Sequence, residues 1–135
     1  MDSEDIAGWD KESQRAWDND PHESEFPDEV AKILREILPL HAQILDCGCG
    51  IGKNIRGFTK LGYVTMGIEQ SPVGAKYARL NSGCEVLNMR LQEIGDIADF
   101  IERFDLIFTS AVLQHSIHER KIGILRNFHL ILKNN

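Results

Sequence analysis

The residues with the greatest chemical potential lie in the segment Ile44–Asn54, which has the sequence ILDCGCGIGKN. An aspartate at 46 precedes glycines at 48, 50 and 52, and cysteines flank the first of these glycines. Alternating glycines let the chain turn sharply and let a ligand approach the backbone without a Cβ in the way. Three kinds of site use such residues: a metal site, a dinucleotide-binding turn, and a turn that holds another nucleotide-like ligand.

The glycine spacing disfavours a dinucleotide. The dinucleotide fingerprint has glycine at its first, third and sixth positions. Counted from Gly48, the sixth position is Lys53, and the third glycine comes one residue early at Gly52. A turn that binds pyrophosphate is therefore not what this spacing predicts.

A metal site is also disfavoured. Cys47 and Cys49 offer two thiolates, but no second cysteine pair follows at the spacing of a zinc site. The segment HSIH offers two histidines without a carboxylate at suitable spacing. We therefore predict no metal, and we interpret Cys47 as a small buried residue at a strand end.

The elements around the motif alternate between strand and helix patterns. Apolar runs of strand length occupy residues 43–47, 63–69, 84–88 and 104–110. Helix-compatible stretches follow them at 53–62, 71–81, around 97–101, and at 118–133, and a helix at 30–38 that ends at Pro39 comes before them. Strands separated by helices predict a parallel α/β sheet covered by helices on both faces. The glycine motif then lies where the first strand turns into a helix, which is where such sheets bind ligands.

Composition predicts one compact domain with an acidic leader. The chain has 135 residues, of which 42% are apolar and 27% charged. Residues 1–29 contain 11 acids and 2 bases, a net charge of −9, and residues 30–135 have a net charge of +3. We divide the chain into a leader or cap, 1–29, and a ligand-binding α/β domain, 30–135. The leader carries Trp9, Trp17 and Phe26, which favours a helix packed on the domain over a flap that closes on substrate.

The same composition argues against several cellular settings. No apolar run approaches a membrane span, and the acidic start lacks the pattern of a secretory signal, so we expect a cytoplasmic protein. The charge distribution does not predict a nucleic-acid groove. The odd number of cysteines, 3, does not indicate a disulfide framework.

Four ordered motifs resemble those of the class I S-adenosylmethionine-dependent methyltransferases. LDCGCGIG resembles the signature acid-x-Gly-x-Gly-x-Gly after their first strand, and YVTMGIEQSP resembles their second strand with its terminal acid. FDLIFTSAVLQH resembles the fourth strand and its loop, and NFHLILKNN the stretch before the fifth. The resemblance covers residues 30–135 and implies a Rossmann-like fold, with S-adenosylmethionine as methyl donor and S-adenosylhomocysteine as product. A substrate nucleophile would attack the methyl carbon in line.

The resemblance also implies a set of cofactor-binding residues. Glu69, which lies 17 residues beyond Gly52, would accept hydrogen bonds from both ribose hydroxyls. Asp46 would lie near the sulfonium and ammonium groups, although it could instead bond N–H groups of the turn. The full implied set is Asp46, Gly48, Cys49, Gly50, Gly52, Asn54, Glu69, Gln70, Arg90, Leu91, Ser110 and Ala111.

Several of these positions have a second interpretation. Arg90 stands where the family often has an acid, and this departs from the family pattern. Backbone groups of Arg90 and Leu91 would still meet the adenine edge, or the segment is an ordinary connection. Gln70 would pack beside the adenine or merely begin the next turn. Ser110 and Ala111 suit a chain passing close to the methionine portion, or tight packing. His115 is a candidate general base for the methyl acceptor, or a hydrogen-bonded loop histidine.

The sequence departs from the family at its end, because it stops after the fourth strand and its helix. The fourth strand would then lie at the sheet edge, although Phe104, Leu106 and Phe108 on one face and Ile107 on the other suit a strand buried on both sides. The chain would be a fragment, or would pair this edge in a homodimer, or its final helix would cover it. We expect a small-molecule methyltransferase; the alternatives are a non-catalytic module that binds S-adenosylmethionine or a partner, and an NAD-linked oxidoreductase.

Overall fold

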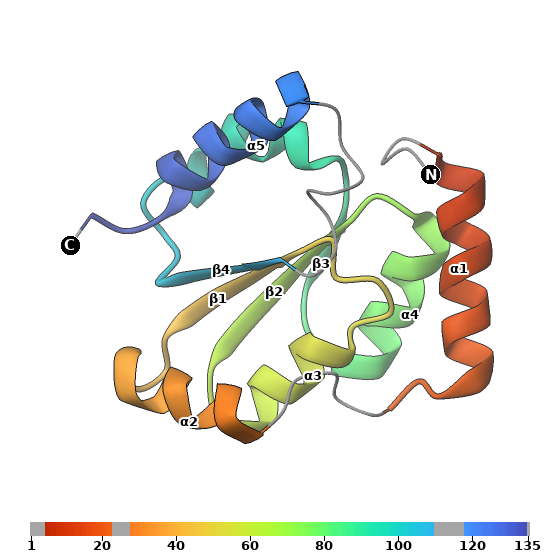
Figure 1. Cartoon of the computed structure of the whole chain (residues 1–135), viewed down its shortest axis with the longest axis horizontal. Coiled ribbons are helices and arrows are strands. Elements are labelled where there is room, and N and C mark those ends of the chain that lie inside the picture. The colour runs from red at the N-terminus through yellow and green to blue at the C-terminus, as the bar shows by residue number, and fades with distance from the viewer. Residues whose placement is uncertain (1–4, 23–27, 110–117, 135) are drawn as a thin grey trace.

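A parallel β-sheet with helices on both faces forms the centre of the computed structural model, which describes residues 5–22, 28–109 and 118–134 (Figure 1). Its strands are β1 (Gln43–Cys47), β2 (Val64–Glu69), β3 (Val86–Asn88) and β4 (Leu106–Thr109). They lie in the order β3-β2-β1-β4, and every neighbouring pair is parallel. The predicted Rossmann-like α/β sheet is confirmed.

The helices are divided between the two faces of the sheet. They are α1 (Ile6–Asn19), α2 (Asp28–Ile37), α3 (Lys53–Lys60), α4 (Pro72–Ser82) and α5 (His118–Ile131), with the 3-10 helices η1 (Leu91–Asp96) and η2 (Ala98–Phe100). Leu45 and Met66 pack with η1, η2 and α5 on one face, whereas Ile44 packs with α2 and α3 on the other. β1 is buried on both faces because successive side chains point to opposite sides.

The start of α4 shows why the second predicted helix forms where it does. Ser71 caps it by accepting a hydrogen bond from the N–H of Gly74, and Pro72 occupies its first turn. Gly83 ends the helix in a left-handed conformation with φ of 70°. This capping makes the helix begin at Pro72, three residues after Glu69.

One predicted element differs in type. The sequence predicted a helical stretch around residues 97–101, whereas the structure has the two short 3-10 helices η1 and η2. α5 packs against η1, and a Cβ on Gly95 would overlap the side-chain oxygen of Asn127. The close approach of α5 therefore favours short, tight turns in this connection.

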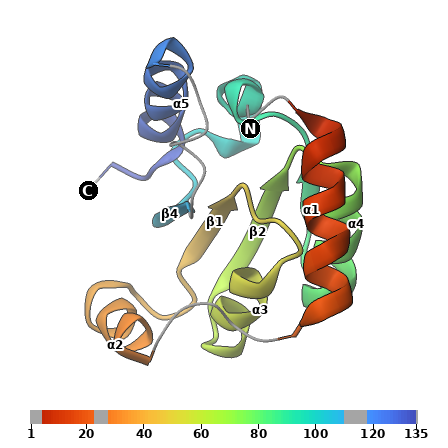
Figure 2. The same ribbon diagram turned by 45° about the vertical axis from the view of Figure 1, so that its right-hand side comes forward.

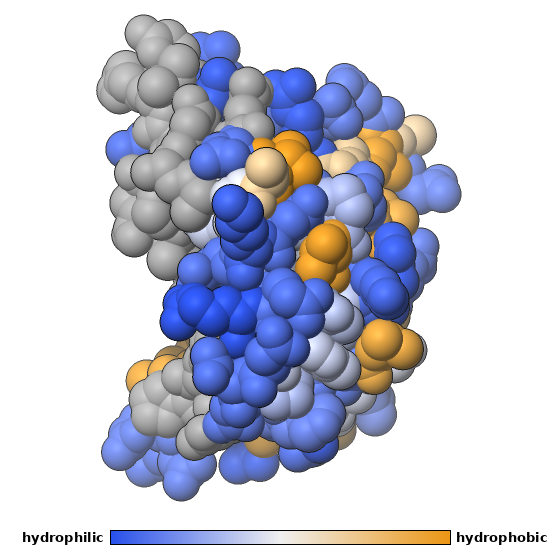
Figure 3. Space-filling model, turned by 90° about the vertical axis from the view of Figure 1, so that its right-hand side faces the viewer, coloured by the Kyte–Doolittle hydropathy of each residue, from blue (hydrophilic) through white to orange (hydrophobic). Residues whose placement is uncertain are grey.

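Helix α1 packs on the outer side of α4 (Figure 2). The rings of Trp17 and Tyr77 stack with centroids 4.4 Å apart, and the Tyr77 hydroxyl donates to Gln14 Oε1 at 2.7 Å. The face of the molecule that carries α1 is predominantly hydrophilic (Figure 3). This arrangement agrees with the interpretation of the leader as a packed helix, while the domain boundary at residue 29 stays a prediction and Phe26 lies outside the described residues.

Strand β4 lies at the edge of the described sheet, as the family strand order predicted. Beyond α5 the chain returns to the beginning of this strand, where Leu132 forms a parallel bridge with Phe104. Phe104 N–H donates to Ile131 O at 3.0 Å, and Lys133 N–H donates to Phe104 O at 2.9 Å.

Among the helices of the described ranges, none combines the length and hydropathy that a membrane span requires.

Candidate functional site

The site is built where β1 and β2 end side by side. Cys47 at the end of β1 is in register with Ile68 of β2. The turn that follows β1 is fastened to β2, because Gly48 N–H and Cys49 N–H both donate to Ile68 O, at 2.8 and 3.0 Å. The glycine motif thus forms a tight turn at the carboxyl edge of the sheet, as predicted.

The glycines of this turn have positive φ angles but different surroundings. φ is 75° at Gly48, 56° at Gly50 and 85° at Gly52. A Cβ on Gly50 would meet no atom within 4 Å, whereas one on Gly52 would lie 2.9 Å from Ala78 Cα in α4. Gly50 therefore leaves space for a ligand, while Gly52 is required for packing between the turn and α4.

Glu69 joins the glycine turn to the start of α4. Its buried carboxylate accepts from Gly50 N–H at 3.0 Å with one oxygen and from Ser71 N–H at 2.8 Å with the other. Burial raises the pKa of this carboxyl, the N–H groups of Ser71 and Gly50 oppose the rise, and the Asp10 carboxylate adds to it. A carboxylate has about four acceptor positions. Glu69 can therefore accept further hydrogen bonds from a ligand.

Asp46 lies fully inside the end of β1, with 1% of its surface exposed. Burial, together with the charge of Asp46, raises the pKa of the Cys47 thiol well above its usual value, and the same causes act on Cys49. Both thiols therefore stay protonated near neutral pH, which does not suit a nucleophile or a metal ligand. Within the described ranges, no group of three or more His, Cys, Asp and Glu side chains could hold a metal ion.

Asn54 in the first turn of α3 is also buried, with 7% of its surface exposed. Its Oδ1 atom has no hydrogen-bond partner among residues 5–22, 28–109 and 118–134. An unsatisfied buried acceptor costs free energy, so a ligand with a hydrogen-bond donor would stabilise it. This oxygen and the open space at Gly50 both fit a ligand bound along the turn.

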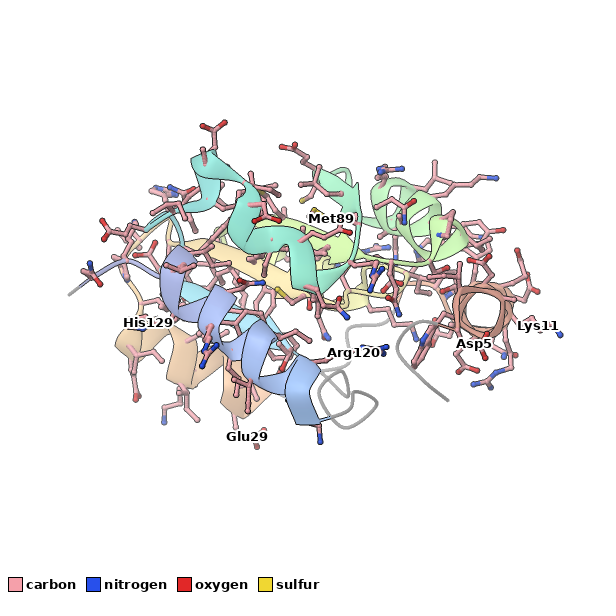
Figure 4. All side chains as sticks on the ribbon, turned by 90° about the horizontal axis from the view of Figure 1, so that it is seen from above. Asp5, Lys11, Glu29, Met89, Arg120 and His129 are labelled. Atoms are coloured by element: carbon pink, nitrogen blue, oxygen red, sulfur yellow. The ribbon has the colours of Figure 1, made fainter. Side chains whose placement is uncertain are left out.

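The ends of β2 and β3 form the predicted adenine side of the site. Asn88 in β3 donates from Nδ2 to Glu69 O at 2.9 Å and to Gln70 O at 3.0 Å. Met89 lies where β3 leads into η1 (Figure 4), and its N–H donates to Glu69 O at 3.2 Å. Leu91 is buried in η1, Gln70 is half-buried, and the Arg90 side chain is exposed.

Sequence reasoning did not identify Asn88 or Ser71 as residues that support Glu69. A signal for each existed, because Asn88 ends the next strand and Ser71 lies two positions after the acid. Asp10, which also approaches this region from α1, gave no local signal. The predicted residues Ser110, Ala111 and His115 lie outside the described residues. The chain enters that segment from Thr109, which is in register with Cys47 at the same edge of the sheet.

Comparisons with known proteins were made on sequence and structure. A family model described as a methyltransferase domain matches residues 45–135. A TehB-like S-adenosylmethionine-dependent methyltransferase from Corynebacterium glutamicum is similar with a TM-score of 0.70 and 25% identity, over 93% of this chain and 67% of that one. A comparison with the curated proteins finds no match.

Two further structures share the fold with ligands bound. One is the 1,6-didemethyltoxoflavin-N1-methyltransferase from Burkholderia thailandensis with 1,6-didemethyltoxoflavin and S-adenosylhomocysteine, at TM-score 0.68 and 19% identity over 97% of this chain. The other is the magnesium protoporphyrin IX methyltransferase from Synechocystis with S-adenosylmethionine, at TM-score 0.62 and 17% identity over 78% of this chain. This chain spans 56% and 52% of their lengths.

Proposed function

Because this chain belongs to the family of class I S-adenosylmethionine-dependent methyltransferases, we propose that it transfers a methyl group from S-adenosylmethionine to a small molecule. The observation that carries the proposal is the buried Glu69 carboxylate, which accepts from Gly50 N–H at 3.0 Å. An acid in this place adjoins the glycine turn and keeps acceptor capacity for two ribose hydroxyls.

S-adenosylmethionine supplies a methyl group that is already activated by its positive sulfur. The protein therefore contributes mainly orientation and exclusion of water. Glu69 would hold the ribose, and the charge of Asp46 would favour the cationic sulfonium and ammonium groups. Asn54 Oδ1 is a buried acceptor suited to the amino-acid portion. Gln70, Arg90 and Leu91 would contact the adenine.

The methyl acceptor is the least constrained part of the proposal. A small molecule is supported by the Burkholderia thailandensis neighbour, which has 1,6-didemethyltoxoflavin bound. We propose that Ser110 and Ala111 adjoin the methionine portion and that His115 removes a proton from an acceptor that must lose one. A cytoplasmic location, and the absence of a nucleic-acid partner, stay predictions from the sequence.

Replacing Glu69 tests the cofactor site. Calorimetry should detect binding of S-adenosylmethionine and S-adenosylhomocysteine by the wild type, with no binding of NAD. Glu69→Ala should weaken cofactor binding by about 1.5–3 kcal/mol, since it removes charge-assisted hydrogen bonds. Glu36→Ala on the exposed side of α2 is a matched control and should bind like the wild type. Unchanged affinity in Glu69→Ala would remove this residue from the site.

The second candidate function is a module that binds the cofactor without catalysis. It would use the same cofactor residues, Glu69 and the glycine turn, but would need neither a methyl acceptor nor a general base. Transfer of a labelled methyl group from S-adenosylmethionine to a metabolite mixture distinguishes the two: an enzyme yields labelled product, and a module yields none. We also propose that the edge of β4 pairs with a second copy of the chain to form a homodimer.

A further inference from the structure

Helix α1 lies before the residues 45–135 that the family model matches, yet it is hydrogen-bonded to the candidate cofactor site. Asp10 Oδ1 accepts from the hydroxyl of Ser71 and, at 3.4 Å, from Val73 N–H. Ser71 is completely buried, and its own N–H donates to the Glu69 carboxylate at 2.8 Å. A continuous chain of hydrogen bonds therefore runs from α1 through the start of α4 to Glu69.

We propose that Asp10 is a positioning residue of the cofactor site, acting through Ser71 to hold the Glu69 carboxylate against the glycine turn. The inference rests on the proposed function for its consequence, which is tighter binding of the adenosyl ribose. Its structural part does not depend on any ligand, because the chain of hydrogen bonds is complete without one.

Packing leaves little freedom in this arrangement. A Cβ on Gly74 would lie 2.8 Å from the Ser13 hydroxyl of α1 and 3.0 Å from Glu69 Cγ. Gly74 is therefore enclosed between α1 and Glu69. The later part of α1 is held on α4, the helix that contains Gly74, by the stacked rings of Trp17 and Tyr77. With α1 fixed at both places, the position of Asp10 determines the position of Ser71.

The charge of Asp10 affects the pKa of Glu69, and this effect can be measured. The charged group that acts on Glu69 is Asp10 from α1, and the protonated thiol of Cys49 is acted on by both Glu69 and Asp46. Burial raises the pKa of Glu69 most, and the negative charge of Asp10 raises it further. Only an ionised Glu69 accepts from both ribose hydroxyls, so affinity is lost as the pH falls through its pKa. Removing the charge of Asp10 lowers that pKa and moves the loss to lower pH.

Two substitutions separate geometry from charge. Asp10→Asn keeps an oxygen that accepts from Ser71 but removes the charge, whereas Asp10→Ala removes both. Glu12→Gln is the matched control, because Glu12 lies on the exposed side of the same helix, where it pairs with Arg15. In the ligand-free protein, NMR chemical shifts of the Gly50 and Ser71 amides are followed against pH, since both amides donate to Glu69. Calorimetry with S-adenosylhomocysteine is then performed over the same pH range.

We expect Asp10→Asn to shift the titration of both amides to lower pH and to bind within about twofold of the wild type at pH 7. Asp10→Ala should bind about three- to tenfold more weakly at pH 7, since it also loses hydrogen bonds that hold Ser71. Glu12→Gln should match the wild type throughout.

The inference would be overturned if the Gly50 and Ser71 amides titrated at the same pH in both Asp10 variants as in Glu12→Gln. Wild-type affinity and an unchanged pH profile in Asp10→Ala would overturn it as well. If the wild type binds no S-adenosylhomocysteine, the proposed function fails, and the ligand-free amide titration still decides whether Asp10 acts on Glu69. Asp10→Asn retains the acceptor, so it reports the effect of the Asp10 charge on Glu69 even if Asp10→Ala does not fold.

Discussion

Gly50 and Gly52 lie two residues apart in one turn, and both adopt positive φ, but their missing side chains serve different purposes. The position of a Cβ on Gly50 is open, whereas that on Gly52 is occupied by the backbone of Ala78. The Cβ position of Gly67 in β2 is also occupied, but by side chains, with Ile55 Cδ1 at 2.5 Å and Cys49 Sγ at 2.7 Å. At the scale of single residues, the motif therefore combines one position with open space at its Cβ and others that let elements pack closely.

This difference predicts separable effects of two alanine substitutions. Gly50→Ala should lower the free energy of unfolding by about 1–2 kcal/mol, through left-handed strain alone, and should also weaken cofactor binding. Gly52→Ala should lower the free energy of unfolding by about 1–3 kcal/mol more than Gly50→Ala does, because the new methyl group meets the backbone of α4. Urea denaturation and calorimetry measure the two effects.

Gly62→Ala is the control for the first substitution, since Gly62 also has a positive φ of 94° and open space around its Cβ position. It lies in the connection before β2, at the opposite end of the strand from Glu69. Cofactor affinity in Gly50→Ala no weaker than in Gly62→Ala would show that Gly50 does not face the ligand.

At the scale of elements, α5 supports the connection that carries the predicted adenine contacts. Figure 4 shows α5 lying beside η1 over the sheet, and the two are in contact. Asn127 Nδ2 donates to Leu91 O at 3.2 Å and to Gln92 O at 3.0 Å. One amide therefore fixes the first turn of η1, which contains Leu91.

Asn127→Ala should release this turn. The free energy of unfolding should fall by about 1–2 kcal/mol, because two partly buried carbonyls lose their donor. Hydrogen exchange should become faster in residues 91–96 than in β1 or β2. Arg126→Ala, at an exposed neighbouring position, is the control and should leave exchange unchanged. Equal protection of residues 91–96 in both variants would contradict a role for Asn127 in holding η1.

At the scale of the whole molecule, β4 is the edge strand of the described sheet. Phe104 directs its N–H and C=O away from β1 and toward residues 131–133. Since alternate residues of a strand direct these groups to the same side, Leu106 and Phe108 direct theirs to the same edge. Such an edge is a template for another strand. In the proposed homodimer, a second copy would pair with this edge at Leu106 and Phe108, because Leu132 already pairs with Phe104.

Sedimentation between about 1 and 100 μM checks this proposal and should show a monomer–dimer equilibrium. Hydrogen exchange at the same concentrations should show increasing protection of the Leu106 and Phe108 amides. Ile107 provides an internal control, because its N–H points to the same side as that of Asp105, which donates to Gln43 O of β1, and it should be protected at every concentration. A monomer throughout the range, with exchange independent of concentration, would exclude the β4 dimer.

The sequence by itself determined the features that depend on local chemistry. Alternating apolar runs predicted the parallel sheet, the glycine spacing placed the turn after β1, and Glu69 was identified at the end of β2. These signals are local because strand burial and positive φ constrain the residue types at their own positions. Residues 97–101 were predicted less well, since packing of α5 on η1 decided the form of that connection.

Only the tertiary structure decided which residues support the site. Asp10 reaches Ser71 across 61 positions of sequence, and Asn127 reaches Leu91 across 36. The roles of Gly50 and Gly52 are likewise distinguished only by the position of α4. Such contacts follow from how helices dock on the sheet, and no periodicity within a single segment encodes that docking. The roles of Ser110, Ala111 and His115 stay predictions from the sequence.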